Sequence, residues 1–197
     1  IIKSQFNCKL EEIYKLNEEE VRILKNNYLD QITKLSDKKN ARIFIDKFPF
    51  QTVCLPLINF IFPDAKIIFT HRHPYDTVLS CFQQAFEPNN AMANLKSLKE
   101  SSQIYDLSMN MWDKYKENLS LDFTTSKYES LIENFDNHTK KILEFLGLEW
   151  NSNIKNFNKT ALSRNKINTP SSSQVVQPLY KTSIGKWENY KKNFEEC

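Results

Sequence analysis

An arginine and a serine that follow an apolar run form the part of this sequence best suited to binding an anion. The stretch IIFTHRHPYDTVLSCF begins with Ile67–Phe69 and contains Arg72 and Ser80. This pattern predicts a buried strand that ends near Arg72 and a helix that begins at Pro74. A guanidinium, a serine hydroxyl and the amides at a helix start can all donate hydrogen bonds to one phosphate or sulfate. In the structural alternative, Arg72 pairs with Asp76 and Ser80 is only a small helix residue.

Lys47 is a second candidate, at the end of a run rich in β-branched and aromatic residues. This run, ARIFIDK, predicts a strand over residues 41–47. A lysine at a strand end is often exposed to solvent without a specific role. Lys47 is a candidate because of its position at the end of a predicted strand. A third predicted strand, over residues 121–128, ends at Tyr128. Because ligands bind outside the carboxyl ends of parallel strands, Lys47, Arg72 and Tyr128 mark the ends expected to face a ligand.

A long polar segment near the end of the chain, TPSSSQVVQPLYKTSIGKWENY, holds further hydroxyl, amide and amino groups. It covers residues 169–190 and includes Ser171, Ser172, Ser173, Gln174 and Lys186. Long polar loops in compact domains are commonly either functional or disordered. The segment is therefore either part of a ligand site or a flexible tail, and Trp187 and Tyr190 are expected to anchor it to the core.

The elements that must position these residues alternate between strands and helices. Strands are predicted over residues 41–47, 66–72 and 121–128, and helices over residues 16–35, 51–62, 74–86, 93–118 and 138–148. Asn17 and Glu20 have the spacing of a capping box at the start of the first helix. Residues 149–185 have a loop-like composition, and an amphipathic stretch over residues 186–196 follows. The alternation predicts an α/β fold with a parallel sheet and right-handed crossovers.

Composition and charge narrow the class of protein. The chain has 197 residues, of which 40% are hydrophobic and 13% aromatic, enough to build the core of one domain. A formal net charge of +3 is too small for a general nucleic-acid binder. The sequence shows no apolar run of transmembrane length and no signal peptide. The four cysteines are widely spaced, without metal-ligand spacing, which fits a reducing compartment, so a cytoplasmic location is expected.

Five motifs, in order along the chain, resemble those of the sulfotransferase family. They are DKFPF, FPDAKIIFTHRHPYDTVLSCF, KYESLIEN, ILEFLGLEW and TPSSSQVVQPLYKTSIGKWENY, and they run from about residue 41 to residue 194. The sequence is most similar to bacterial sulfotransferases that often follow tetratricopeptide repeats, and to tyrosylprotein sulfotransferases. The RxPxDxxxS pattern alone has low specificity, whereas five ordered motifs ending in a lysine–tryptophan pair have high specificity.

The resemblance implies a three-layer α/β fold like that of the P-loop nucleotide kinases, with helices flanking a parallel sheet. It also implies 3′-phosphoadenosine 5′-phosphosulfate (PAPS) as co-substrate, no metal, and sulfuryl transfer to an acceptor hydroxyl. Transferred position by position, the family's cofactor-binding residues are Arg72, Ser80, Tyr128, Ser171, Ser172, Ser173, Gln174 and Lys186. Arg72 and Ser80 would hold the 3′-phosphate, and Tyr128 would contact the adenosine. Lys47 and Ser171 would lie near the transferring sulfuryl group and act in catalysis.

One feature of the family has no counterpart in the sequence. The family begins with a strand and a glycine-containing loop, like PRSGTT, that wraps the 5′-phosphosulfate, whereas the glycines here are Gly147 and Gly185. We therefore expect a C-terminal portion of a longer protein, whose upstream part supplies that loop and any tetratricopeptide repeats. Residues 1–40 would be a helical lead-in, residues 41–148 the α/β core, and residues 149–197 a cofactor-covering loop and terminal helix.

Two alternatives to a sulfotransferase remain open. A non-catalytic module would keep the phosphoadenosine-binding residues without the phosphosulfate loop. A P-loop nucleotide kinase would need a GxxxxGKS/T loop upstream of this chain. In either the enzyme or the module, the chain alone is expected to transfer sulfate poorly or not at all. The general base, the oligomeric state and the acceptor (protein tyrosine, carbohydrate, lipid or a small molecule) stay open at this stage.

Overall fold

The computed structural model describes residues 10–35, 43–48, 50–84, 92–163, 174 and 176–195. The chain divides into two compact units. The first contains Ile1–Lys66 and Asn110–Asp122, and the second contains Ile67–Met109 and Phe123–Cys197. Among the described residues, no helix has both the length and the apolar character needed to cross a membrane.

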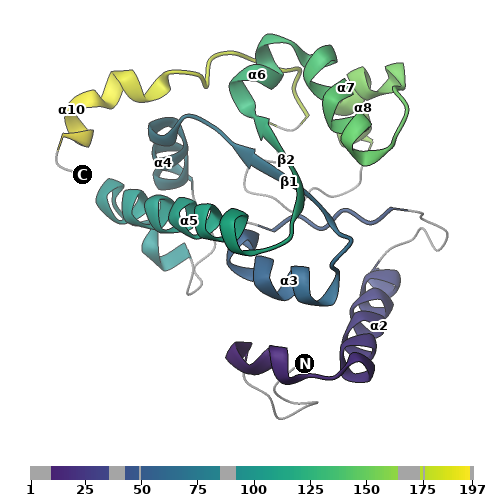
Figure 1. Ribbon diagram of the computed structural model, residues 1–197. Coiled ribbons are helices and arrows are strands. Elements are labelled where there is room, and N and C mark those ends of the chain that lie inside the picture. Colours follow the sequence, from purple (N-terminus) through teal and green to yellow (C-terminus); the bar gives the residue numbers. More distant parts are fainter. Residues whose placement is uncertain are drawn as a thin grey trace. The chain divides into compact units, whose positions relative to one another are not determined.

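Helices dominate the described part of the first unit (Figure 1). A 3-10 helix, η1 (Leu10–Lys15), precedes α2 (Glu18–Leu35), and η2 (Gln51–Cys54) leads directly into α3 (Leu55–Ile61). The predicted capping box at the start of α2 is confirmed. The Glu20 amide donates a hydrogen bond to the Asn17 side chain at 3.0 Å, and the Asn17 amide donates to the Glu20 carboxylate at 2.9 Å. Pro56 lies in the first turn of α3, where its missing N–H costs no helical hydrogen bond.

The predicted strand over residues 41–47 is wrong for the part that the structure describes. Residues 43–48 are exposed and form neither helix nor strand. Asp46 holds this segment instead, because its Oδ2 accepts hydrogen bonds from Tyr28 Oη at 2.6 Å and from Gln51 Nε2 at 3.1 Å. Partial burial and the bond to Asp46 raise the pKa of Tyr28 to about 12. A strand requires a paired neighbour, and the two strands of the described chain pair with each other. The first two residues of the predicted strand lie outside the described residues.

Two parallel strands form the sheet of the second unit. β1 (Lys66–His71) and β2 (Asp122–Lys127) are hydrogen-bonded neighbours, and Figure 1 shows their arrows pointing the same way. α4 (Pro74–Gln83) follows β1, and α5 (Leu98–Asn118) belongs to this unit as far as Met109. The strands predicted over residues 66–72 and 121–128 are therefore confirmed, and the chain is a mixed α/β protein.

The chain beyond β2 is more helical than its composition suggested. It contains α6 (Tyr128–Glu133), α7 (Phe135–Leu146), η4 (Ser152–Asn156), α8 (Phe157–Leu162), η5 (Lys186–Tyr190) and α10 (Lys191–Phe194). η4 and α8 lie within residues 149–185, which were predicted to be loop. A short η3 (Met92–Asn94) precedes α5. α5 begins later than predicted because Ser97 caps it, with Oγ accepting a hydrogen bond from the Glu100 amide at 3.1 Å.

An apolar core in the second unit joins α4 to the end of the chain. Val78 and Leu79 of α4 are buried together with Phe194 of α10, and Leu98, Tyr105 and Trp187 pack against them. Burial of each large apolar side chain contributes roughly 1.5–3 kcal/mol to stability. This packing confirms the prediction that Trp187 anchors the polar C-terminal segment, whereas Tyr190, the other predicted anchor, is exposed.

Gly147 ends α7 in a left-handed conformation, with φ of 69°. Its amide donates to the Glu144 carbonyl, and the Leu148 amide donates to the Leu143 carbonyl at 2.8 Å. A Cβ at this position would meet no atom within 4 Å, so substitution changes only the backbone preference. We expect Gly147→Ala to lower the free energy of unfolding by about 1 kcal/mol and Gly147→Asn by less, measured by urea denaturation. Equal stability of the alanine variant and the wild type would contradict this account of the α7 end.

Candidate functional site

A cavity of about 330 Å³ lies in the second unit, where β1 ends and α4 begins. Its walls come from β1 and the residue after it, and from α4, α5 and the start of α6. The lining residues are Thr70, His71, Arg72, Thr77, Ser80, Cys81, Tyr105, Met109 and Tyr128. Three of them, Arg72, Ser80 and Tyr128, are residues that the sequence selected as ligand-binding. These three predicted residues therefore share one cavity.

Arg72 is largely buried, with 20% of its side chain exposed, directly after β1. Its Nη2 donates a hydrogen bond to the Ser183 carbonyl and lies 3.7 Å from Asp76 Oδ1. Its guanidinium carbon lies 5.2 Å from the centre of the Tyr128 ring. Its Nε is buried and has no hydrogen-bond partner. Because an unpaired donor of a charged group is costly to bury, the guanidinium keeps donor capacity that a ligand or a water molecule could satisfy.

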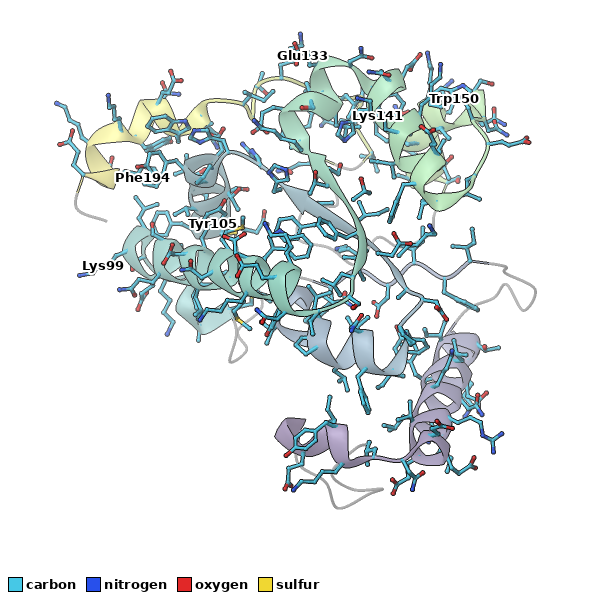
Figure 2. The ribbon with its side chains drawn as sticks, viewed as in Figure 1. Lys99, Tyr105, Glu133, Lys141, Trp150 and Phe194 are labelled. Atoms are coloured by element: carbon cyan, nitrogen blue, oxygen red, sulfur yellow. The ribbon has the colours of Figure 1, made fainter. Side chains whose placement is uncertain are left out.

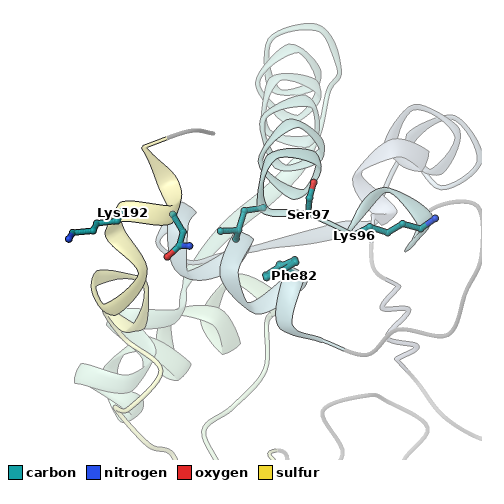
Figure 3. A pocket seen from close by; sticks show the side chains of 6 residues that line it. Phe82, Lys96, Ser97 and Lys192 are labelled. Carbon is teal, nitrogen blue, oxygen red and sulfur yellow. The ribbon is translucent and has the colours of Figure 1, made fainter.

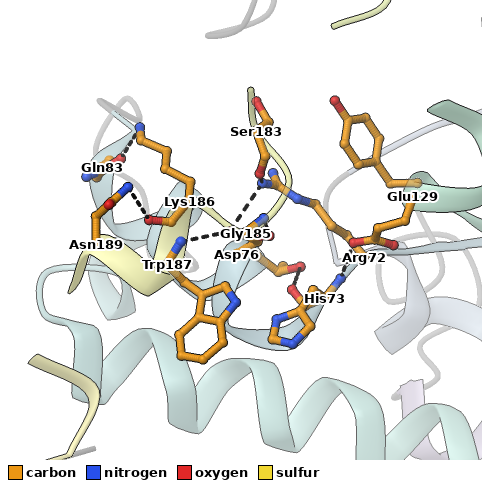
Figure 4. A network of polar contacts seen from close by, with 12 residues as sticks. Arg72, His73, Asp76, Gln83, Glu129, Ser183, Gly185, Lys186, Trp187 and Asn189 are labelled. Carbon is orange, nitrogen blue, oxygen red and sulfur yellow. Dashed lines mark hydrogen bonds and ion pairs between the residues drawn. The ribbon is translucent and has the colours of Figure 1, made fainter. Parts of the chain in front are cut away.

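Asp76 is the most strongly constrained acidic residue of the site, with a side chain that is fully buried. Its carboxylate accepts hydrogen bonds from the Gly185 amide at 2.8 Å and from the Trp187 amide at 3.0 Å. Figure 4 shows these bonds joining α4 to the C-terminal segment beside Arg72. The Arg72–Asp76 pair that formed the structural alternative therefore exists, but the shorter contacts of Asp76 are to the backbone of the C-terminal segment.

Tyr128 contributes a second link between the cavity and that segment. Its hydroxyl donates a hydrogen bond to the Tyr180 carbonyl at 3.3 Å. Burial raises the pKa of Tyr128, the neighbouring Tyr180 adds to the shift, and the positive charge of Arg72 partly opposes it. Tyr128 therefore stays neutral near physiological pH, and its ring offers a face on which the guanidinium rests.

Glu129 supports the start of α4 from the adjacent element. Its Oε1 accepts a hydrogen bond from the His73 amide at 2.8 Å, and its Oε2 is buried without a partner. Burial acts to raise the pKa of the Glu129 carboxyl, but the His73 hydrogen bond and the charges of Lys127 and Arg72 outweigh it and lower the pKa. The carboxylate is therefore ionised, and it adds negative charge near the guanidinium.

The α4 face of the cavity carries three small polar side chains. Thr77 Oγ1 donates to the His73 carbonyl at 3.1 Å, so its hydrogen is already used. The Ser80 hydroxyl is exposed and has no hydrogen-bond partner among the described residues. Burial raises the pKa of the Cys81 thiol, while Arg72 acts to lower it, so the thiol is neutral. Ser80 is thus the free donor on this wall, and together with Arg72 it can hold an oxyanion.

Comparison with known proteins agrees with this chemistry. The sequence model described as "Sulfotransferase family" matches residues 4–152. The chain belongs to the sulfotransferase family. The matched range contains Arg72, Ser80 and Tyr128, and it ends before the polar segment over residues 169–190.

A relative of this sulfotransferase-family chain occurs in Aquifex aeolicus (strain VF5), where it carries the name "Uncharacterized protein". The two sequences are 28% identical over 169 residues, which cover 84% of this chain and 21% of the relative. The chain therefore spans about a fifth of the length of that relative.

None of the other predicted site residues that the structure describes is among the residues that line the cavity. Lys186 donates from Nζ to Gln83 Oε1 at 2.8 Å, at the far end of α4 (Figure 4). Gln174 is exposed, and Ser171, Ser172 and Ser173 lie outside the described residues. Lys47 is exposed and belongs to the first unit, whereas the cavity belongs to the second. The roles assigned to these residues stay predictions.

Sequence reasoning missed one residue of the site and part of the role of another. Asp76 was considered only as an ion-pair partner of Arg72, although its carboxylate also accepts hydrogen bonds from two backbone amides of the C-terminal segment. Tyr105 was not selected, because α5 carries several aromatic and apolar residues and nothing in its sequence marks the one that reaches the cavity. Only the packing of α5 against α4 identifies it.

A second concavity, of about 380 Å³, lies where α4, α5 and α10 meet. It is lined by Phe82, Lys96, Ser97, Leu98, Lys192 and Asn193. Figure 3 shows the ammonium groups of Lys96 and Lys192 pointing away from Phe82 in opposite directions. Because the two ammonium groups point apart, they do not form one anion site. The cavity lined by Arg72, called the Arg72 cavity below, is therefore the stronger candidate for an anion site.

Proposed function

We propose that this protein uses PAPS and transfers its sulfuryl group to an acceptor hydroxyl, with the 3′-phosphate of the nucleotide bound in the Arg72 cavity. Membership of the sulfotransferase family supports the reaction class. The observation that carries the choice of cavity is the buried, unpaired Nε of Arg72 in a space that Ser80 also lines. A planar guanidinium fork and a hydroxyl are donors that suit a phosphate group.

The other residues take supporting roles in this proposal. Tyr128, at the start of α6 directly after β2, would contact the adenosine, and Ser171–Gln174 with Lys186 would cover the nucleotide. Lys47 and Ser171 would lie near the sulfuryl group. Sulfuryl transfer resembles phosphoryl transfer in its loose transition state, so the protein contributes mainly positioning and charge stabilisation. A P-loop-like fold, in which backbone amides bind the other end of the nucleotide, completes the proposal.

Nucleotide binding tests the proposed cavity. Isothermal titration calorimetry should show 3′-phosphoadenosine 5′-phosphate (PAP) binding at least about tenfold more tightly than adenosine 5′-phosphate (AMP), because one set of charge-assisted hydrogen bonds is worth ~1.5–3 kcal/mol. ATP, which lacks a 3′-phosphate, should behave like AMP. Equal affinity for PAP and ATP would favour a nucleotide kinase and would contradict the proposal.

Sulfate transfer separates an enzyme from a binding module. Because this chain alone is expected to transfer sulfate poorly, the full-length protein is incubated with radiolabelled PAPS and separate acceptors containing tyrosine, carbohydrate or small-molecule hydroxyls, and labelled product is counted. Label on one acceptor class supports the enzyme and names its substrate. Tight PAP binding without label on any acceptor would support the non-catalytic alternative.

A further inference from the structure

The cavity around Arg72 contains a hydrogen-bond donor that lies outside the five sequence motifs, the hydroxyl of Tyr105. Tyr105, on α5, lines the cavity together with Ser80 of α4, and its hydroxyl makes no hydrogen bond to any described residue. Arg72 Nε is also unpaired, and so is the Ser80 hydroxyl. Three donors, from the segment after β1, from α4 and from α5, therefore line one cavity of about 330 Å³, and none of the three has an acceptor among the described residues.

The Tyr105 ring is held in place by the core of the second unit. It packs against the buried cluster of Val78, Leu79 and Phe194. Figure 2 shows Tyr105 on α5, the long helix next to α4. A side chain fixed by packing loses little rotamer freedom when a ligand binds, so its hydroxyl can donate at low entropic cost.

The charge state of Tyr105 suits a donor. Burial raises the pKa of its hydroxyl, and the negative charge of Glu129 raises it further. The phenol therefore keeps its proton at physiological pH. The influence of Glu129 also defines a competing explanation, in which Tyr105 is a purely structural residue that interacts with this carboxylate.

We propose that the Tyr105 hydroxyl is a third donor to the anion held by Arg72 and Ser80, and that α5 thereby forms part of the phosphate site. This inference rests on the proposed function for the identity of the anion as a 3′-phosphate. It adds a binding residue that lies outside the motifs of the sulfotransferase family. A phosphate has three terminal oxygens, so it can accept from the guanidinium, the serine and the phenol at once.

The test compares Tyr105→Phe with the wild type by calorimetry, with PAP and AMP as separate ligands. The substitution keeps the ring that packs in the core and removes only the hydroxyl. Affinity for PAP should fall about tenfold to a hundredfold, the range expected for one hydrogen bond to a charged group, while affinity for AMP stays unchanged. Tyr115→Phe, on the same helix and outside the cavity lining, is the matched control and should leave both affinities unchanged.

The possible outcomes distinguish a failure of the Tyr105 inference from a failure of the proposed nucleotide binding. Unchanged PAP affinity in Tyr105→Phe overturns the third donor. A parallel loss of PAP and AMP affinity, with a lower unfolding temperature, overturns it in favour of the structural interaction with Glu129. If the wild type itself binds PAP no better than AMP, the nucleotide proposal fails. Inorganic phosphate then decides the donor question, because weaker phosphate binding by Tyr105→Phe supports a phenol donor and equal binding excludes it.

Discussion

Replacing Asp76 by alanine is expected to lower the free energy of unfolding by about 2–5 kcal/mol, because two buried amides lose their acceptor together. These amides belong to Gly185 and Trp187, at 2.8 and 3.0 Å from the carboxylate. The loss should also loosen the C-terminal segment, because these hydrogen bonds join it to α4 and their removal leaves contacts such as the stacking of Trp187 on the His73 ring, with the ring centres 5.3 Å apart. Urea denaturation measures the first effect, and the rate of protease cleavage within residues 176–195 measures the second.

Asp113→Ala is a matched control for this substitution. Asp113 lies on α5 with 58% of its side chain exposed, and it pairs with Lys116 at 2.8 Å. An exposed pair of this kind contributes little, so the control should change stability by less than about 0.5 kcal/mol. The stability of Asp76→Asn should lie between those of Asp76→Ala and Asp113→Ala, because the asparagine amide oxygen can accept a hydrogen bond from one of the two backbone amides. Wild-type stability in Asp76→Ala would show that the C-terminal segment is held by its apolar contacts alone.

Features with local causes were predictable from the sequence. The Asn17–Glu20 capping box involves residues three apart and forms as expected. The apolar run before Arg72 is a strand, as expected. α4 begins shortly after it, with a proline in its first turn. The sequence therefore located the strand end and the helix start that place Arg72 and Ser80 beside the same cavity.

Features that depend on distant partners were not predictable. The run over residues 41–47 has the residue types of a strand, but strand formation depends on a backbone neighbour that composition does not specify. Asp76 and Gly185 are separated by 109 residues, and Lys186 and Gln83 by 103. No local pattern indicates that the Lys186 ammonium binds a glutamine at the end of α4. Tyr105 reaches the cavity only through the packing of α5 on α4.

The largest effect on ligand binding is expected from Arg72→Ala, which should weaken PAP binding by about a hundredfold or more, as for two lost hydrogen bonds to a charged group. Arg72→Lys keeps the charge but loses the planar fork, so we expect about a tenfold loss. AMP affinity should change little in either variant. Arg22→Ala, on α2, is the control, since Arg22 is an exposed residue paired with Glu19 at 2.6 Å.

Arg72 also has structural contacts, and the two variants separate these from its ligand contacts. The alanine variant removes the partner of a fully buried carboxylate and of the Ser183 carbonyl, so its stability should fall along with its affinity. A parallel loss of PAP and AMP binding would therefore indicate a damaged fold. The lysine variant keeps a cation near Asp76, so a selective loss of PAP binding at near wild-type stability would assign the guanidinium to the 3′-phosphate. Unchanged PAP affinity in both variants would show that Arg72 does not bind the ligand and that its role is structural, holding the C-terminal segment.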